Sequence, residues 1–235
     1  MEGKLKVLLF DIDGTLIRGG GAGRKALNRA ALKLYGKKNA CSELSLAGRT
    51  DLYNFGQTCF LATGKKPTAA AVEKLHQEYL KFLPYYVKAA LRSRTYHIPP
   101  GLKVLLKHLS RDKRVLLGLG TGNMEQGARI KLEPSGFNAY FLFGGYGSDA
   151  FHRHALLKKA VVRAKELARA SFTAKDVYVI GDTPFDVIAG KKAGYKTVAV
   201  GTGYASWKEL NDAHPDHLAK DFRNINIWLK WFELN

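Results

Sequence analysis

Short apolar runs alternate with segments of helical spacing through most of the chain. Four runs are nearly continuous and bounded by Gly or Asp, which is typical of strands in a parallel sheet covered on both faces. They span residues 4–10, 115–120, 177–181 and 196–200. Apolar residues spaced three and four apart predict helices over 101–110, 123–132, 154–170 and 186–193. This alternation predicts an α/β fold, a doubly wound parallel sheet with right-handed crossovers.

One long segment, residues 19–98, breaks this rhythm. It contains no convincing β run, and its spacing predicts helices over 24–35, 68–83 and 85–92. It begins at a glycine-rich stretch and ends at Pro99-Pro100-Gly101, and both ends are natural hinges. We therefore expect a core domain of residues 1–18 and 99–235 and an inserted helical domain of residues 19–98.

The composition of the 235 residues fits a folded protein. Hydrophobic residues make up 46% of the chain, enough to bury a sizeable core. Two cysteines, Cys41 and Cys59, are too few for a disulfide framework. The N-terminal apolar run stops at Asp11, and no stretch approaches the ~20 apolar residues that a bilayer needs. We expect a cytoplasmic protein with no membrane partner.

The net charge of +18 is concentrated in the insertion. Residues 18–98 hold 15 basic and 4 acidic residues, a net charge of +11. A basic surface attracts anions, including phosphorylated metabolites and nucleic acids, but it also favours solubility. Because no run of five to eight Lys or Arg residues occurs, a nucleic-acid partner is the weaker interpretation.

Polar residues follow three of the predicted strands directly. Because parallel strands end at a shared edge where ligands bind, these residues are expected to meet there. They are Asp11 and Asp13 after the first run, Thr121, Gly122 and Asn123 after the second, and Asp182 and Asp186 after the third. Four converging carboxylates repel each other unless a hard cation lies among them, and their oxygens suit Mg²⁺.

Three motifs in this order carry a resemblance to a known family. The segment DIDGTL (11–16), the threonine at 121 and the segment GDTPFD (181–186) resemble the signature motifs of the haloacid dehalogenase-like superfamily, specifically its Mg²⁺-dependent phosphatases. The match covers nearly the whole chain in order and spacing. It implies a Rossmann-like core, with the helical insertion acting as a cap domain.

The resemblance implies a role for each acidic residue. Asp11 would attack phosphorus and form an aspartyl-phosphate. Asp13 would protonate the leaving alcohol and then take a proton from the hydrolytic water. Mg²⁺ would be held by Asp11, by the backbone carbonyl of Asp13 and by Asp182, with Asp186 assisting or orienting water.

Other residues would bind the phosphoryl group. The Thr121 hydroxyl would donate to it, and Gly122 and Asn123 can add backbone N–H donors at a helix N-terminus. Such phosphatases usually carry a lysine before the last motif, whereas here the corresponding position holds Arg153, which suits bidentate phosphate contact. The alternatives at this position are Lys158 and Lys159.

The insertion holds one candidate for substrate recognition. Gly48-Arg49-Thr50-Asp51 resembles the family's substrate-facing loop, so Arg49 is expected either to contact a substrate anion or to be an ordinary surface residue. His152 and His154 flank Arg153. With oxygen ligands available for Mg²⁺, we interpret both histidines as surface or supporting residues.

The expected function is phosphatase activity on a small phosphorylated metabolite such as phosphoglycolate, a sugar phosphate or a nucleotide. A true dehalogenase would need neither Asp13 nor the metal-binding aspartates. A sugar-phosphate mutase shares these residues and differs mainly in excluding water. A non-catalytic anion or nucleic-acid binder on the same fold is a third hypothesis, opposed by the intact catalytic set. Specificity lies in the cap, and both a monomer and a homodimer are compatible with the sequence.

Overall fold

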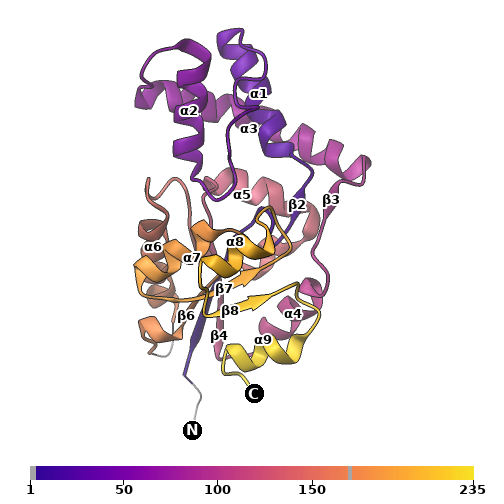
Figure 1. The fold of residues 1–235 in the computed structure, drawn as a ribbon, viewed down its shortest axis with the longest axis vertical. Helices are drawn as coiled ribbons and strands as arrows, with labels where there is room; N and C mark the ends of the chain where they lie inside the picture. Colours follow the sequence, from indigo (N-terminus) through magenta and orange to yellow (C-terminus); the bar gives the residue numbers. More distant parts are fainter. Residues whose placement is uncertain (1–3, 169–170) are drawn as a thin grey trace.

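A single parallel sheet organises the core. The computed structural model describes residues 4–168 and 171–235. Six strands lie in the order β5-β4-β1-β6-β7-β8, all parallel (Figure 1). They are β1 (Lys6–Phe10), β4 (Val115–Gly120), β5 (Phe143–Gly145), β6 (Val177–Gly181), β7 (Lys196–Val200) and β8 (His217–Ala219). This order confirms the predicted doubly wound sheet, with β1 at its centre.

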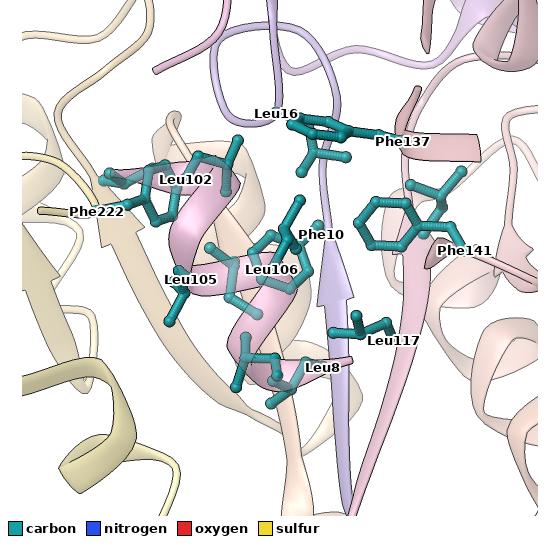
Figure 2. Packing of buried hydrophobic residues seen from close by; sticks show 14 of the residues in the cluster. Leu8, Phe10, Leu16, Leu102, Leu105, Leu106, Leu117, Phe137, Phe141 and Phe222 are labelled. Carbon is teal, nitrogen blue, oxygen red and sulfur yellow. The ribbon is translucent and has the colours of Figure 1, made fainter. Parts of the chain in front are cut away.

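Alternate residues of β1 face opposite layers, as the pleat of a strand requires. Leu8 and Phe10 pack with the first helical layer, and Val7 and Leu9 with the second. The first layer consists of α4 (Leu102–Leu109), α5 (Glu125–Leu132) and α9 (Ile225–Trp231), and Figure 2 shows α4 against β1. The second consists of α6 (Arg153–Leu167) and α7 (Pro184–Ala193). A short helix, α8 (Trp207–Asp212), packs beside α7.

Three helices form a separate layer beyond the carboxyl ends of the strands (Figure 1). They are α1 (Ala22–Tyr35), α2 (Asp51–Thr63) and α3 (Ala69–Arg92). They share a hydrophobic cluster of their own that includes Leu27, Phe55 and Leu83. Two short antiparallel strands, β2 (Arg18–Gly19) and β3 (Tyr96–His97), connect this helical cap to the core.

The cap differs from the sequence prediction in its longest helix and in its β structure, besides the unpredicted α2. Residues 68–83 and 85–92, predicted as two helices, form the single helix α3, with Pro84 inside it. Proline removes one backbone donor and costs about 3 kcal/mol within a helix. Leu83 and Val87 are both buried in the cap cluster, and this packing on either side of the proline holds the helix together. The expectation of no β structure in the insertion was also wrong, because β3 lies within it.

Further elements were not predicted. These are α2, β5, β8, α8 and α9, each short or without a clear apolar period. The helix predicted over 154–170 ends at Leu167, and residues 169 and 170 lie outside the described residues. Within the described ranges no helix combines the length and the apolar character needed to cross a membrane.

Candidate active site

Three carboxylates meet at the carboxyl edge of the sheet. Asp11 follows β1, Asp182 follows β6, and Asp186 lies in the first turn of α7. All three are buried, and each offers an oxygen within 4.8 Å of the others. Burial and the charges of Asp186 and Asp13 raise the pKa of Asp11 to about 6, against the opposing charge of Arg153. Burial, followed by the charges of Asp186 and Asp11, also raises the pKa of Asp182.

Neighbouring residues enclose the Asp182 carboxylate closely. Its Oδ1 accepts a hydrogen bond of 3.1 Å from the Thr15 hydroxyl, and its Oδ2 accepts one of 2.9 Å from the backbone N–H of Tyr204. A Cβ on Gly14 would lie 2.2 Å from Oδ2, and one on Gly203 would lie 1.7 Å from it. Both positions therefore require glycine for the carboxylate to keep its place.

Asp186 is oriented by the start of its own helix. Its Oδ2 accepts hydrogen bonds from the backbone N–H and the hydroxyl of Thr183, at 3.0 and 2.7 Å, in a capping box. Its Oδ1 accepts a hydrogen bond from Arg153. A carboxylate held on both oxygens turns little, so Asp186 presents a fixed charge to the site.

Arg153 reaches the site from the N-terminal end of α6. Its Nη2 lies 3.1 Å from Oδ1 of Asp11, and the same atom pairs with Asp186. The alternatives considered from sequence, Lys158 and Lys159, are exposed. Arg153 is thus the cation of this helix that contacts the carboxylate cluster.

The two histidines beside Arg153 lie away from the three clustered carboxylates. His152 is exposed and His154 is half-buried. Their rings stack on each other, with centroids 5.7 Å apart. Nearby positive charge adds to burial in lowering the pKa of His154.

Asp13 faces a second group of side chains. Its Oδ2 accepts hydrogen bonds from the Lys131 ammonium at 2.6 Å and from the Asn123 amide at 2.9 Å. Lys131 also donates to Oδ1 of Asn123 at 2.6 Å. Burial alone would lower the pKa of Lys131, but the neighbouring Asp13, Tyr79 and Asp51 together outweigh it, and the pKa lies above its ordinary value.

The loop after β4 holds the remaining predicted residues close to this group. The Thr121 hydroxyl accepts hydrogen bonds from both the backbone N–H and the side-chain amide of Asn123. The carbonyl of Gly122 accepts the backbone N–H of Asp51 at 2.7 Å. A Cβ on Gly122 would lie 2.2 Å from the carbonyl oxygen of Arg49. Glycine at this position therefore lets residues 48–51, the cap loop, approach the loop after β4. Because the N–H of Asn123 is already paired, it is less available to an anion than the sequence suggested.

A cavity of about 300 Å³ lies between the carboxylates and the cap. Asp11, Asp13 and Lys131 line its core side, and Tyr79 and Phe55 line its cap side. The volume is at the lower end of the ~300–1,000 Å³ found for ligand pockets, which suits a small molecule.

Arg49 lies at the rim of this cavity. Its guanidinium lies over the rings of Tyr53 and Phe185, at 4.9 and 4.7 Å from their centroids. Arg49 also borders a second groove of about 240 Å³ on the outer side of the loop. Its charge is therefore engaged with aromatic rings.

The carboxylate cluster fits a divalent metal ion. Burial and then mutual repulsion among Asp11, Asp182 and Asp186 raise the pKa of the first two, and the Arg153 charge beside Asp11 opposes this only in part. Hard oxygen donors in this number suit a small dication that keeps some of its water. The site can thus hold a metal beside the buried Asp11, with the Asp13 carboxylate on the cavity side.

Sequence reasoning missed three residues of this site. They are Thr15, which holds Asp182; Asp51, whose carboxylate accepts the N–H of Met124; and Lys131. For Lys131 a signal existed. Met124, Ala128 and Lys131 follow the spacing of a buried helix face, and a lysine on such a face needs a charged partner.

Known proteins match the chain along most of its length. Residues 8–200 match the family described as haloacid dehalogenase-like hydrolase. A phosphoglycolate phosphatase of Aquifex aeolicus is 26% identical over 221 residues, which cover 90% of this chain and 91% of that protein.

Solved structures show the same fold. A predicted phosphoglycolate phosphatase from Haemophilus somnus has a TM-score of 0.69 at 18% identity, covering 97% of this chain and 99% of that one. A proposed β-phosphoglucomutase from Bacteroides vulgatus also has a TM-score of 0.69 at 18% identity, covering 98% and 89%. With the family match spanning more than half of its length, the chain belongs to the haloacid dehalogenase-like hydrolases.

Proposed function

We propose that the protein is a Mg²⁺-dependent phosphatase that hydrolyses a small phosphorylated metabolite through an aspartyl-phosphate intermediate. One observation carries this proposal: buried Asp11 lies among two further carboxylates and Arg153, and it lines a small cavity. Asp13 lines the same cavity. The relatives named phosphoglycolate phosphatase support the substrate class.

Each step has a residue of suitable chemistry. A carboxylate oxygen of Asp11 attacks phosphorus while the bond to the leaving oxygen breaks, and Asp13 gives that oxygen a proton. Asp13 then takes a proton from water, whose oxygen attacks phosphorus and releases phosphate and Asp11. Arg153 and the Thr121 hydroxyl bind the phosphoryl oxygens. Bound Mg²⁺, held by Asp11, Asp182 and the Asp13 carbonyl with help from Asp186, would supply positive charge for the transferring group.

The cap supports a small substrate. The helical unit of residues 19–98, which we propose as the moving domain, covers the cavity and excludes bulk water from the reaction. Arg49 at the rim would meet an anionic part of the substrate as it enters. The candidate substrates are phosphoglycolate, a sugar phosphate and a nucleotide.

Phosphate release from a panel of such metabolites tests the proposal. Turnover should require Mg²⁺, stop with chelator and fall at least ~10³-fold in Asp11→Asn, which removes the nucleophile. Asp13→Asn should lose ~10²-fold or more on an alkyl phosphate, and much less on 4-nitrophenyl phosphate, whose leaving oxygen scarcely needs a proton. Undiminished turnover by Asp11→Asn would refute the mechanism.

A sugar-phosphate mutase is the second candidate, because its reaction would use the same residues and a proposed β-phosphoglucomutase shares the fold. The two functions differ in the fate of phosphate. A phosphatase releases it, whereas a mutase returns it to the sugar and needs a bisphosphorylated sugar for priming. Isomerised sugar phosphate without free phosphate would favour the mutase.

A further inference from the structure

Lys131 lies where the core and the cap meet. Its side chain comes from α5, and its ammonium contacts Asp13 and Asn123 at 2.6 Å each. From the cap side it is covered by α1 and α3. A Cβ on Gly23 of α1 would lie only 3.3 Å from its Nζ and 3.6 Å from the hydroxyl of Tyr79 on α3.

The two carboxylate oxygens of Asp13 differ in their hydrogen bonds. Both the Lys131 ammonium and the Asn123 amide donate to Oδ2. Among the described residues, no side chain or backbone group donates to Oδ1. A carboxylate anchored at one oxygen has its other oxygen held in a constant direction, although the terminal torsion of Asp is otherwise soft.

We propose that Lys131 is a positioning residue that, together with Asn123, anchors Oδ2 of Asp13 so that Oδ1 faces the reacting oxygen. The inference rests on the proposed phosphatase function. The proton on Oδ1 passes to the ester oxygen as the bond from phosphorus to that oxygen breaks. Oδ1 then accepts a proton from the water that attacks the aspartyl-phosphate.

The position of Lys131 also links this anchor to the cap. Gly23 leaves the space that the ammonium occupies, and Tyr79 lies across it. With the cap in this position Lys131 is enclosed, and its ammonium remains in contact with Asp13.

Lys131→Met and Lys131→Arg test the anchor with an alkyl phosphate and with 4-nitrophenyl phosphate. Positioned general acids contribute ~10²–10⁴-fold, so Lys131→Met should lose at least ~10-fold more kcat on the alkyl ester than on the aryl ester, with KM little changed. Lys131→Arg keeps the positive charge and N–H donors for both partners, and should recover most of the loss. Lys103→Met, at an exposed position of α4, is the control for losing a positive charge and should match the wild type.

Gly23→Ala disturbs the anchor without removing any charge. Alanine is the better helix former, so Tm should stay or rise, while the new methyl pushes Nζ by a few tenths of an ångström. We expect a loss of about threefold or more on the alkyl ester alone. Gly56→Ala in α2, where the nearest atom to the new Cβ is 3.8 Å away on Pro67, is the matched control and should change neither substrate.

The outcomes separate this inference from the proposed function. Equal losses on both esters in Lys131→Met and Gly23→Ala, with Asp11 still essential, would overturn the anchor and leave the phosphatase intact. Failure of Lys131→Arg to recover activity would also count against it. If Asp11→Asn keeps full turnover, the phosphatase proposal itself fails.

Discussion

The guanidinium of Arg49 lies 4.7 Å from the ring centroid of Phe185. Arg49 belongs to the cap loop and Phe185 to α7 of the core, so this contact crosses the two layers. Two hydrogen bonds run beside it, from the Thr50 hydroxyl to the Phe151 carbonyl and from the Asp51 N–H to the Gly122 carbonyl. Together these contacts hold the cap loop on the core.

Removing the Phe185 ring should weaken the contact between the cap loop and the core. A cation–π contact contributes about 0.5–2 kcal/mol, so Phe185→Ala should raise KM by roughly two- to tenfold, with a smaller effect on kcat. Steady-state kinetics with a small alkyl phosphate measure this. Ile188→Ala, on the same helix and also exposed, controls for lost apolar surface and should leave KM unchanged. Equal effects of both variants would show that Phe185 does not act through Arg49.

Mg²⁺ should stabilise the fold through Asp182. Burial and then repulsion among neighbouring carboxylates raise the pKa of Asp11 and Asp182, and a bound cation would offset both effects. The wild-type Tm should rise with Mg²⁺ concentration, because binding to the folded state alone adds stability by mass action. Asp182→Asn should keep or raise the Tm measured without metal, and its Tm should no longer rise with Mg²⁺ concentration. A thermal shift that persists in Asp182→Asn would place the metal elsewhere.

Gly14 should tolerate no side chain. Its φ is +95°, and a Cβ would lie 2.2 Å from Oδ2 of Asp182. Gly14→Ala should cost about 1–2 kcal/mol from the backbone and also abolish Mg²⁺-dependent turnover. Gly36→Ala is the matched control, since its φ is +68° and nothing lies within 4 Å of its Cβ. It should lower Tm to a similar extent and retain kcat.

Glu233 should make stability depend on acidity. Hydrogen bonds from Lys196 and Lys6 lower the pKa of Glu233 to about 2 from an ordinary value of 4.5. A carboxylate whose pKa is depressed on folding stabilises above its unfolded pKa, and this contribution is lost as pH falls from about 4.5 to 2.

Solvent screens the ion pairs that Glu233 makes with Lys6 and Lys196, because the Glu233 side chain is 56% exposed. Glu233→Gln should therefore lower the free energy of unfolding by only about 1 kcal/mol at pH 7, and the difference from wild type should shrink at pH 3. Urea unfolding at both pH values measures it. Glu43→Gln, an exposed glutamate in a loop, should show no such difference. A constant deficit at both pH values would mean that the glutamate acts by packing.

Much of the core could be predicted from local pattern. Strands buried on both faces leave continuous apolar runs, so the centre of the sheet and the acids that end β1 and β6 were readable without a structure. Short edge strands such as β8 and short helices such as α9 carry too few residues for a period to emerge. Their apolar residues identify a strand or a helix only when the packing against the sheet is known.

The partners of charged side chains depend on the packing of distant segments. The position of Asp13 follows from the end of its strand, whereas its contact with Lys131 joins residues 118 apart in the chain. Pro84 likewise predicts a break, yet the helix continues because buried neighbours on both sides hold it. Local sequence sets backbone preference and burial. Which ammonium meets which carboxylate depends on how the cap packs on the core, a sum of many weak contacts that no short stretch encodes.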